Sequence, residues 1–498
     1  MIKRSISTLI ITLIIYSSSL IIGNNQTVNA QTGDVVWDPP INLSNSIGGS
    51  TRPALAADPW GQVHVFWSEK IGGKSTPEGQ APEEGNSIYY SRWNGSHWSE
   101  PTDIFYSYQG EPFKDPVVAI DSKGYLHLVW IGGNSKIYHS QSYALAPVSA
   151  KSWQPSQALA NGSGVTRAEI ATGPSDQIYV VYDAPGDDGL IYTLRSLDGG
   201  SNWSAPISIS DIYSPEAGFD IRPRIEVDFQ GRIHVKWQEQ TLPPEFKGIG
   251  LYYTYSKDEG ITWSQQINLN EGLDYPNEFG WDPGFIVATE GENLLDINIA
   301  GDAARRYYRY SQDGGQNWSQ ARQVFGGLIS RAGWDAVAVD GAGTAHLIVQ
   351  LRYPSALYYS NWSSDNWIDP PVPIITSGPL ATAHYPQMVI SEGNQIHVVM
   401  QEHPGGEIWY MRGVSQAQYN SPAPLPDPQT SPTEGPTSSE TTTPSSPLNE
   451  IDQVSIEQSD LLNSGASQTS ALIPSLIGIL AAVLVFVAAF FLRRLFSD

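Results

Sequence analysis

Arginine, carboxylate and aromatic residues recur at two places in a repeated sequence unit, just before one strand-like run and just after the next. Guanidinium groups bind carboxylates through two parallel hydrogen bonds, and concave sites with aromatic walls and a few convergent polar groups suit small polar ligands. The mixture predicts a site for a saccharide-like or carboxylated ligand. Any single member could instead be a solvated residue at a strand end, so the prediction rests on the cluster. The candidates are Arg52, Glu69, Asp115, Arg167, Arg222, Arg224, Glu239, Trp281, Asp282, Arg331, Trp334, Asp335, Tyr385 and Glu402.

The runs beside these residues form seven copies of one pattern. In residues 53–67 and 116–130, apolar residues alternate with others on both sides of a turn that contains Asp and Gly. Alternation with a period of two around a glycine-containing turn predicts a β-hairpin. The other copies are residues 168–182, 223–237, 285–299, 335–349 and 387–401.

Each hairpin is followed by a third alternating run, a tight turn and a short fourth run, so every unit supplies four strands over roughly 50 residues. Four-stranded repeats of this length stack around a channel as the blades of a β-propeller. We therefore predict an all-β, seven-bladed β-propeller. The seventh unit stops after three strands, at residues 407–413, whereas residues 35–44 resemble a fourth strand. The N-terminal strand is expected to complete the last blade and to close the ring, which removes exposed sheet edges.

The turn between the third and fourth strands has the spacing Ser-x-Asp-x-Gly-x-x-Trp in residues 196–203, 256–263 and 311–318. This turn resembles the Asp box, or BNR repeat, of the sialidase superfamily, and the resemblance extends over about residues 35–413. An Asp in such a turn accepts hydrogen bonds from the turn's own amides, while Gly supplies a positive φ. In the family these turns lie away from the active face. The expected structural aspartates are Asp198, Asp258 and Asp313.

The resemblance also implies what an active enzyme would need. A sialidase of this family uses three arginines to bind the substrate carboxylate, a Tyr nucleophile activated by a Glu, and an Asp as acid/base. Arg52 and Tyr385 resemble the first arginine and the late Tyr of that pattern, and Glu402 is the accompanying catalytic candidate. These three residues would serve an exo-α-sialidase or another glycoside hydrolase.

Several features depart from that pattern. Lys70 follows Glu69 where an arginine is more usual, and residues 71–87 contain no Asp. Seven units exceed the six blades of the catalytic family, and no motif selects the two remaining arginines. We therefore favour a non-catalytic propeller that binds a glycan or an extracellular protein at its channel mouth, with the glycoside hydrolase as the alternative.

The two ends of the chain indicate export and anchoring. Residues 1–30 have two basic residues, an apolar stretch and small residues before position 31, as is typical of a signal peptide. Residues 471–492 are uncharged, long enough to cross a bilayer, and followed by two arginines. We expect an extracellular propeller (31–413), a Pro/Ser/Thr-rich disordered stalk (414–470), a single transmembrane helix (471–492) and a cytoplasmic tail (493–498) at the cell membrane. A sorting tail that is removed is the alternative for the last segments.

Composition narrows the partners and cofactors. The chain has 51 acidic and 27 basic residues, a net charge of −24, which repels nucleic acid and anionic lipid surfaces. Without Cys it has neither disulfides nor a thiol nucleophile. We predict no metal, no cofactor and a monomer whose 16 Trp, 25 Tyr and 13 Phe pack between the sheets. The histidines that recur at one strand position, and are expected to pack, are His64, His127, His234, His346 and His397.

Overall fold

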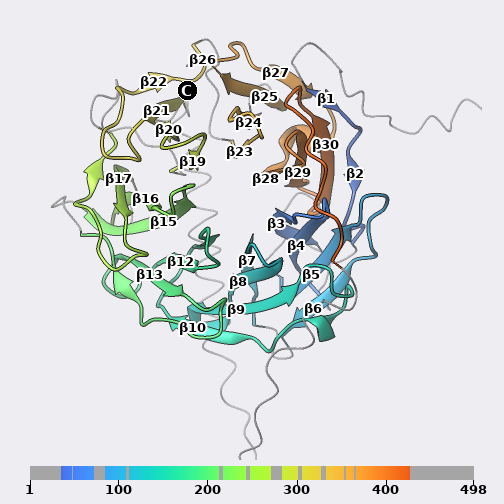
Figure 1. Cartoon of the computed structure of the whole chain (residues 1–498), viewed down its shortest axis with the longest axis horizontal. Helices are drawn as coiled ribbons and strands as arrows, with labels where there is room; N and C mark the ends of the chain where they lie inside the picture. The colour runs from blue at the N-terminus through green and yellow to red at the C-terminus, as the bar shows by residue number, and fades with distance from the viewer. Residues whose placement is uncertain are drawn as a thin grey trace, which may run out of the picture. The chain divides into compact units, whose positions relative to one another are not determined.

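The computed structural model describes residues 35–46, 49–71, 85–107, 111–211, 217–242, 247–270, 283–300, 305–326, 333–352, 355–363 and 366–426. These residues form seven antiparallel sheets arranged as a ring (Figure 1), which confirms the predicted seven-bladed β-propeller. No helix within the described ranges is long and apolar enough to cross a membrane. The predicted signal peptide, most of the stalk and the predicted transmembrane helix lie outside these ranges.

The strands of each blade follow one another in sequence. Blade one is β3 (Ser50–Ala57), β4 (Val63–Glu69), β5 (Ser87–Trp93) and β6 (Thr102–Tyr106). Blade two is β7 (Lys114–Ile120), β8 (Tyr125–Ile131), β9 (Lys136–Tyr143) and β10 (Gln157–Asn161), with short 3-10 helices at Gly133–Ser135 and Ala150–Ser152. Blade three is β11 (Ala168–Thr172), β12 (Ile178–Asp183), β13 (Ile191–Ser196) and β14 (Ile207–Ser208). Blade four is β15 (Ala217–Val227), β16 (Ile233–Thr241), β17 (Gly248–Ser256) and β18 (Ile267–Asn268).

The last three blades keep this order. Blade five is β19 (Phe285–Ala288), β20 (Leu294–Ala300), β21 (Arg305–Ser311) and β22 (Arg322–Gln323). Blade six is β23 (Asp335–Val339), β24 (Ala345–Arg352), β25 (Ser355–Ser363) and a broken fourth strand, β26 (Asn366–Trp367) and β27 (Val372–Ile375). A 3-10 helix at Pro379–Thr382 leads into blade seven, which is β28 (His384–Ser391), β29 (Gln395–Gln401) and β30 (Ile408–Val414). The first strands of neighbouring blades contact one another around the whole ring, so they line the channel.

The N-terminal segment closes blade seven, as predicted. β1 (Val36–Trp37) and β2 (Ile41–Asn42) both pair antiparallel with β30, with Trp37 opposite Gly413 and Ile41 opposite Tyr410. Two prolines separate β1 from β2, and proline has no N–H to donate to a strand ladder, so the fourth strand is broken there.

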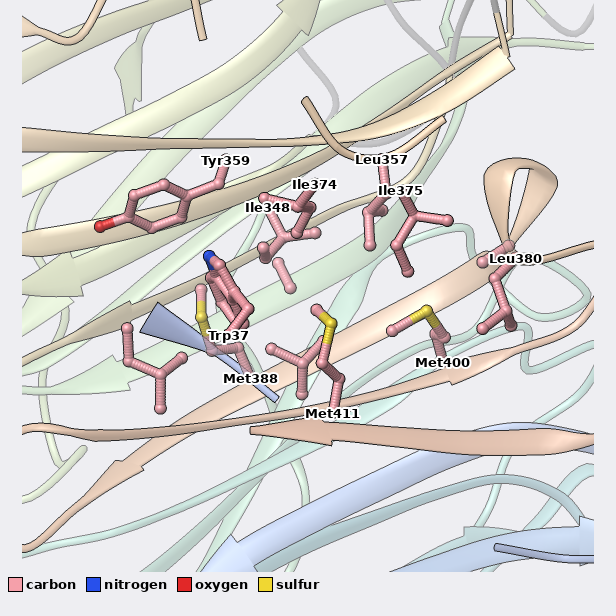
Figure 2. Packing of buried hydrophobic residues seen from close by; sticks show 14 of the residues in the cluster. Trp37, Ile348, Leu357, Tyr359, Ile374, Ile375, Leu380, Met388, Met400 and Met411 are labelled. Atoms are coloured by element: carbon pink, nitrogen blue, oxygen red, sulfur yellow. The ribbon is translucent and has the colours of Figure 1, made fainter. Parts of the chain in front are cut away.

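The closing strand also supplies a core residue between blades six and seven. Figure 2 shows Trp37 among methionines of blade seven and the side chains of Ile348 and Tyr359 from blade six. The Trp37 ring meets the Tyr359 ring edge-on, with 5.5 Å between centroids, and Trp37 is buried. Closure therefore rests on apolar packing as well as on strand pairing.

The recurring histidines form buried hydrogen-bonded chains rather than purely apolar contacts. Asp58 accepts hydrogen bonds from the amides of Trp60 and Gln62, and its other oxygen lies 3.2 Å from Nε2 of His64. Nδ1 of His64 lies 2.7 Å from the Tyr90 hydroxyl. Burial lowers the pKa of His64, so the ring is neutral at neutral pH. Equivalent chains in other blades are Asp121–His127–His139, Asp228–His234–Tyr253, Asp340–His346–Tyr359 and Ser391–His397–Tyr410.

The Asp-box carboxylates are occupied within their own turns. Asp198 accepts from the Asn202 amide at 2.8 Å and from the Ser196 hydroxyl at 2.8 Å. Asp258 and Asp313 accept from the equivalent amides of Thr262 and Asn317. These hydrogen bonds lower the pKa of all three carboxyl groups.

The chain beyond β30 packs against the turns that follow the first strands. The Ser415 amide donates to the carbonyl of Asn394, and the Asn420 amide donates to the carbonyl of Glu392. Further on, the Ala423 amide donates to the carbonyl of Pro59 in blade one. Residues 415–426, which the sequence analysis places in the stalk, therefore lie along one end of the blades.

Candidate functional site

One repeat position supplies a ring of polar and aromatic side chains to the channel mouth. In blades one, two, four and seven this residue stands six positions before the first residue of the following turn and is followed by proline. Its backbone is left-handed, with φ of 54° at Arg52, 44° at Asp115, 57° at Arg222 and 49° at Tyr385. The strand register shifts beside each of them, as in a β-bulge. Such a conformation is disfavoured for non-glycine residues and tends to persist where the fold uses the redirected side chain.

A small cavity of about 60 Å³ lies at this mouth. It is bounded by the first strands of all seven blades, near the ends at which these strands begin. The turns on which residues 415–426 lie follow the other ends of the first strands. The side-chain lining of the cavity includes Arg52, Asp115, Arg167, Glu169, Arg224, Phe285, Trp334, Asp335, Tyr385 and Gln387.

One side of the cavity combines a guanidinium with two aromatic rings. Arg52 lies 3.8 Å from the centre of the Tyr385 ring and 3.1 Å from a carboxylate oxygen of Asp115. The Tyr385 ring is 4.2 Å from the Trp334 ring, centroid to centroid. Within the described part of the chain, Tyr385 contacts rings and a guanidinium, and its hydroxyl donates to no carboxylate. This side therefore offers a cation, an anion and two flat apolar faces.

The other side is built around Glu169. Its carboxylate accepts from Arg224 of blade four at 2.7 Å and lies 3.2 Å from Arg167 of its own blade. The Arg224 guanidinium also lies 4.8 Å from the centre of the Phe285 ring. Next to this group, Arg306 holds Asp335 with two hydrogen bonds of 2.7 and 2.6 Å, and both side chains are buried. Charged groups therefore hold one another in place across blade boundaries.

The structure brings seven of the predicted site residues together at this cavity: Arg52, Asp115, Arg167, Arg224, Trp334, Asp335 and Tyr385. Arg222 belongs to the same ring of bulges but does not line the cavity. Trp281, Asp282 and Arg331 lie outside the described residues.

Three predicted carboxylates lie away from the cavity and are engaged elsewhere. Glu69 is buried and accepts from Ser46, Ser50 and Trp67. Glu239 is buried opposite Asp220. Glu402 accepts from the Trp409 indole at 2.9 Å, in the loop between β29 and β30.

Glu169, Phe285 and Gln387 line the cavity but were not predicted from the sequence, and Glu169 is the charged member of this set. It stands two positions after Arg167, just as Arg224 stands two positions after Arg222. Because side chains alternate along a strand, a residue two positions beyond a mouth residue faces the channel as well. That spacing was available in the sequence and identifies Glu169. Among the described residues, no group of three or more His, Asp or Glu side chains is arranged to hold a metal ion.

The fold and this site define a sialidase-like β-propeller with Asp-box turns and a polar, aromatic channel mouth. No family model matches the chain. Over 231 residues it is 25% identical to a sialidase of Clostridium perfringens, a match that covers 42% of this chain and 56% of that sialidase. The chain thus spans little more than half the length of this curated relative.

Two solved structures share the fold at low sequence identity. The BP39L lectin from Burkholderia pseudomallei aligns with a TM-score of 0.54 and 16% identity over 76% of this chain and 99% of the lectin. An ulvan lyase, which is a polysaccharide lyase, aligns with a TM-score of 0.54 and 13% identity over 76% of this chain and 97% of the lyase. The same propeller architecture therefore occurs in proteins that bind sugars and in proteins that cleave them, which is consistent with glycan binding.

Proposed function

We propose that the chain is a non-catalytic glycan-binding propeller whose channel mouth holds one terminal saccharide group. The observation that carries this proposal is the arrangement of Arg52 between Asp115 and the ring of Tyr385, beside Trp334. Sugar hydroxyls both donate and accept hydrogen bonds, so a guanidinium next to a carboxylate can bind one hydroxyl pair. The apolar face of a sugar ring packs on aromatic side chains.

The size of the cavity supports a shallow mode of binding. A volume of about 60 Å³ has room for a few water molecules. A carboxylate or a hydroxymethyl group fits such a space. We infer that one substituent enters the cavity and that the ring rests over Trp334 and Tyr385.

The alternative is hydrolysis of a sialoside or another glycoside, with Tyr385 as nucleophile and Arg52 in a carboxylate clamp. The 25% identity to a sialidase and the contact between Arg52 and Tyr385 favour it. A Tyr nucleophile needs a neighbouring base, however, and Tyr385 has no carboxylate partner among the described residues. Binding without turnover accounts for the observed contacts more simply.

We also propose that the propeller is displayed at the cell surface through residues 471–492. Support comes from the uncharged run at these positions and from the last described residues, which lie at the end of the blades opposite the mouth.

A glycan array probed with the full chain, followed by titration of the best saccharide, tests the proposal. Arg52→Ala and Tyr385→Ala should weaken binding about tenfold or more, as loss of a charged hydrogen bond or an aromatic contact predicts. Arg322→Ala, which removes an exposed arginine on β22, is the matched control and should bind like the wild type. Release of fluorophore from a fluorogenic sialoside by the wild type, abolished in Tyr385→Phe, would instead establish the hydrolase.

A further inference from the structure

One repeat position lies at or near the end of the second strand, ten residues after the first residue of the preceding turn. Ser68, Asp183, Gln350 and Gln401 stand at this position in blades one, three, six and seven, and all four are buried. A buried polar side chain is costly unless it is hydrogen-bonded, so the partners of these residues reveal their role.

Asp183 binds the mouth loops of two blades at once. Its Oδ1 accepts from the amides of Thr166 and Arg167 at 2.7 and 3.1 Å. Its Oδ2 accepts from the Thr166 hydroxyl at 2.6 Å and from the Arg222 amide of blade four at 3.0 Å. One carboxylate thus fixes both the loop that carries Arg167 and the left-handed bulge that precedes Arg224.

The equivalent residues in other blades also reach the next blade. Oε1 of Gln401 accepts from the Thr51 hydroxyl at 2.8 Å and from the Arg52 amide at 3.3 Å, which joins blade seven to blade one. The Ser68 hydroxyl donates to the carbonyl of Phe113, two residues before Asp115. Gln350 donates to the carbonyl of Ala381, in the segment that leads to Tyr385.

We propose that Ser68, Asp183, Gln350 and Gln401 are positioning residues, each of which holds the mouth segment of the following blade from near the end of its own second strand. The importance of the mouth rests on the proposed function, whereas the contacts themselves do not depend on it. The left-handed bulges at Arg52 and Arg222 are intrinsically disfavoured. Gln401 and Asp183 accept from those very amides and so hold the bulges in the conformation that aims Arg52 and Arg224 at the cavity.

Hydrogen exchange of the full chain, measured by mass spectrometry on peptides, tests the positioning role without any ligand. Asp183→Asn replaces one acceptor oxygen by an N–H₂ group. It should raise exchange about tenfold in peptides that contain Thr166–Arg167 or Arg222, and leave the Arg52 peptide unchanged. Gln401→Leu should raise exchange in the Arg52 peptide and leave the peptides that contain Thr166–Arg167 or Arg222 unchanged. Gln401→Glu keeps the acceptor oxygen and should exchange like the wild type.

Affinity for the array-selected saccharide provides the second readout. Asp183→Asn and Gln401→Leu should weaken binding about tenfold at a temperature at which both are folded, whereas Gln401→Glu should restore it. Asp340→Asn removes a buried carboxylate at the opposite end of a blade and should lower thermal stability without changing affinity.

Each result has a definite meaning. Unchanged exchange at Arg222 in folded Asp183→Asn, or equal effects of Asp340→Asn at the mouth peptides, would overturn the positioning role. Should Asp183→Asn fail to fold, the Gln401→Leu and Gln401→Glu pair decides by the same criteria. A wild type that binds no saccharide would refute the proposed function, while the exchange data would still decide whether these residues position the mouth.

Discussion

The guanidinium of Arg52 lies 3.8 Å from the centre of the Tyr385 ring, although the two residues belong to the first and the last blade of the chain. Both sit in left-handed, pre-proline bulges of first strands that contact each other across the closure of the ring. The contact therefore depends on blades one and seven being neighbours in the closed ring. The geometry of the mouth and the closure of the propeller are therefore physically linked.

Substitutions of Tyr385 can distinguish a binding site from a hydrolytic site. Its ring, rather than its hydroxyl, contacts Arg52 and Trp334. Tyr385→Phe should therefore keep saccharide affinity within about twofold, whereas Tyr385→Ala should lower it about tenfold or more, because an aromatic or cation–π contact is worth about 1–2 kcal/mol. Titration of the purified full chain with the selected saccharide measures both. A large loss of affinity in Tyr385→Phe would show that the hydroxyl binds the ligand.

Closure of the ring can be tested at Trp37. This buried residue of β1 packs against Tyr359, whereas its neighbour Val36 is 68% exposed. Trp37→Ala should lower the free energy of unfolding by about 3–5 kcal/mol, the usual cost of removing a buried aromatic side chain. Val36→Ala, the matched control, should change it by less than about 0.5 kcal/mol. Urea unfolding followed by circular dichroism compares the two, and equal stabilities would contradict the packing role of the closing strand.

Much of the fold could be predicted because its determinants are local. Alternation with a period of two, turns with Gly and Asp, and a missing fourth strand in the last unit together predicted seven blades and their closure by residues 35–44. The same repeat predicted which positions surround the mouth. It could not predict which arginine pairs with which carboxylate, because Glu169 meets Arg224 only through the packing of two adjacent blades.

The misplaced carboxylates have a simple geometric explanation. Glu69 stands two residues after Trp67, and Glu239 stands two residues after Trp237. Both tryptophans are fully buried core residues, and side chains two positions apart on a strand share a face. The two glutamates therefore point into the blade rather than into the channel. The position of these glutamates in the repeat does not by itself show which way their side chains point. The burial of the tryptophan two residues earlier does show it.

Because its histidines are buried, we expect the protein to lose stability in acid. Burial lowers the pKa of His397 from 6.5 to about 3 in the folded state. The stability that this neutral ring contributes is fully present above pH 6.5 and is lost as the pH falls from 6.5 towards 3, because the unfolded chain then binds a proton that the folded chain does not. The free energy of unfolding should fall by about 1.4 kcal/mol per pH unit for each such histidine.

Substitution of His397 measures how much this residue contributes to the pH dependence of the free energy of unfolding. His397→Gln should be less stable than the wild type at pH 7 but should lose stability less steeply between pH 6 and 4. His97→Gln removes an exposed histidine and is the matched control. Denaturant titrations at several pH values measure the slopes, and identical slopes for His397→Gln and the wild type would contradict a neutral buried ring.

Blade four has two facing carboxylates at the position where blade one pairs a serine with a glutamate. In blade one, Ser50 lies opposite Glu69 and donates to it at 2.6 Å, and the Trp67 indole donates at 2.9 Å. In blade four the opposite pair is Asp220 and Glu239, so the donor is replaced by a second acid. Neither oxygen of Asp220 accepts a hydrogen bond of normal geometry within the described part of the chain, although the side chain is fully buried. The Ser210 hydroxyl and the Trp237 indole lie close enough to lower its pKa, but burial outweighs them.

This difference predicts that Asp220→Ser stabilises the protein at alkaline pH. Burial, together with the charge of Glu239, raises the pKa of Asp220 from 3.8 to about 8. A raised pKa means that the folded state retains a proton that the unfolded state has lost, so stability falls as the pH rises from about 4 to 8. A serine has no charge to bury and can donate to Glu239, as Ser50 does to Glu69. Asp220→Ser should therefore raise the free energy of unfolding by about 1–3 kcal/mol at pH 8.5 and by much less at pH 4.

The reverse change in blade one, Ser50→Asp, should lower the free energy of unfolding most at pH 8.5. Thermal or denaturant unfolding at the two pH values measures both, and a less stable Asp220→Ser at pH 8.5 would show that Asp220 has a stabilising partner.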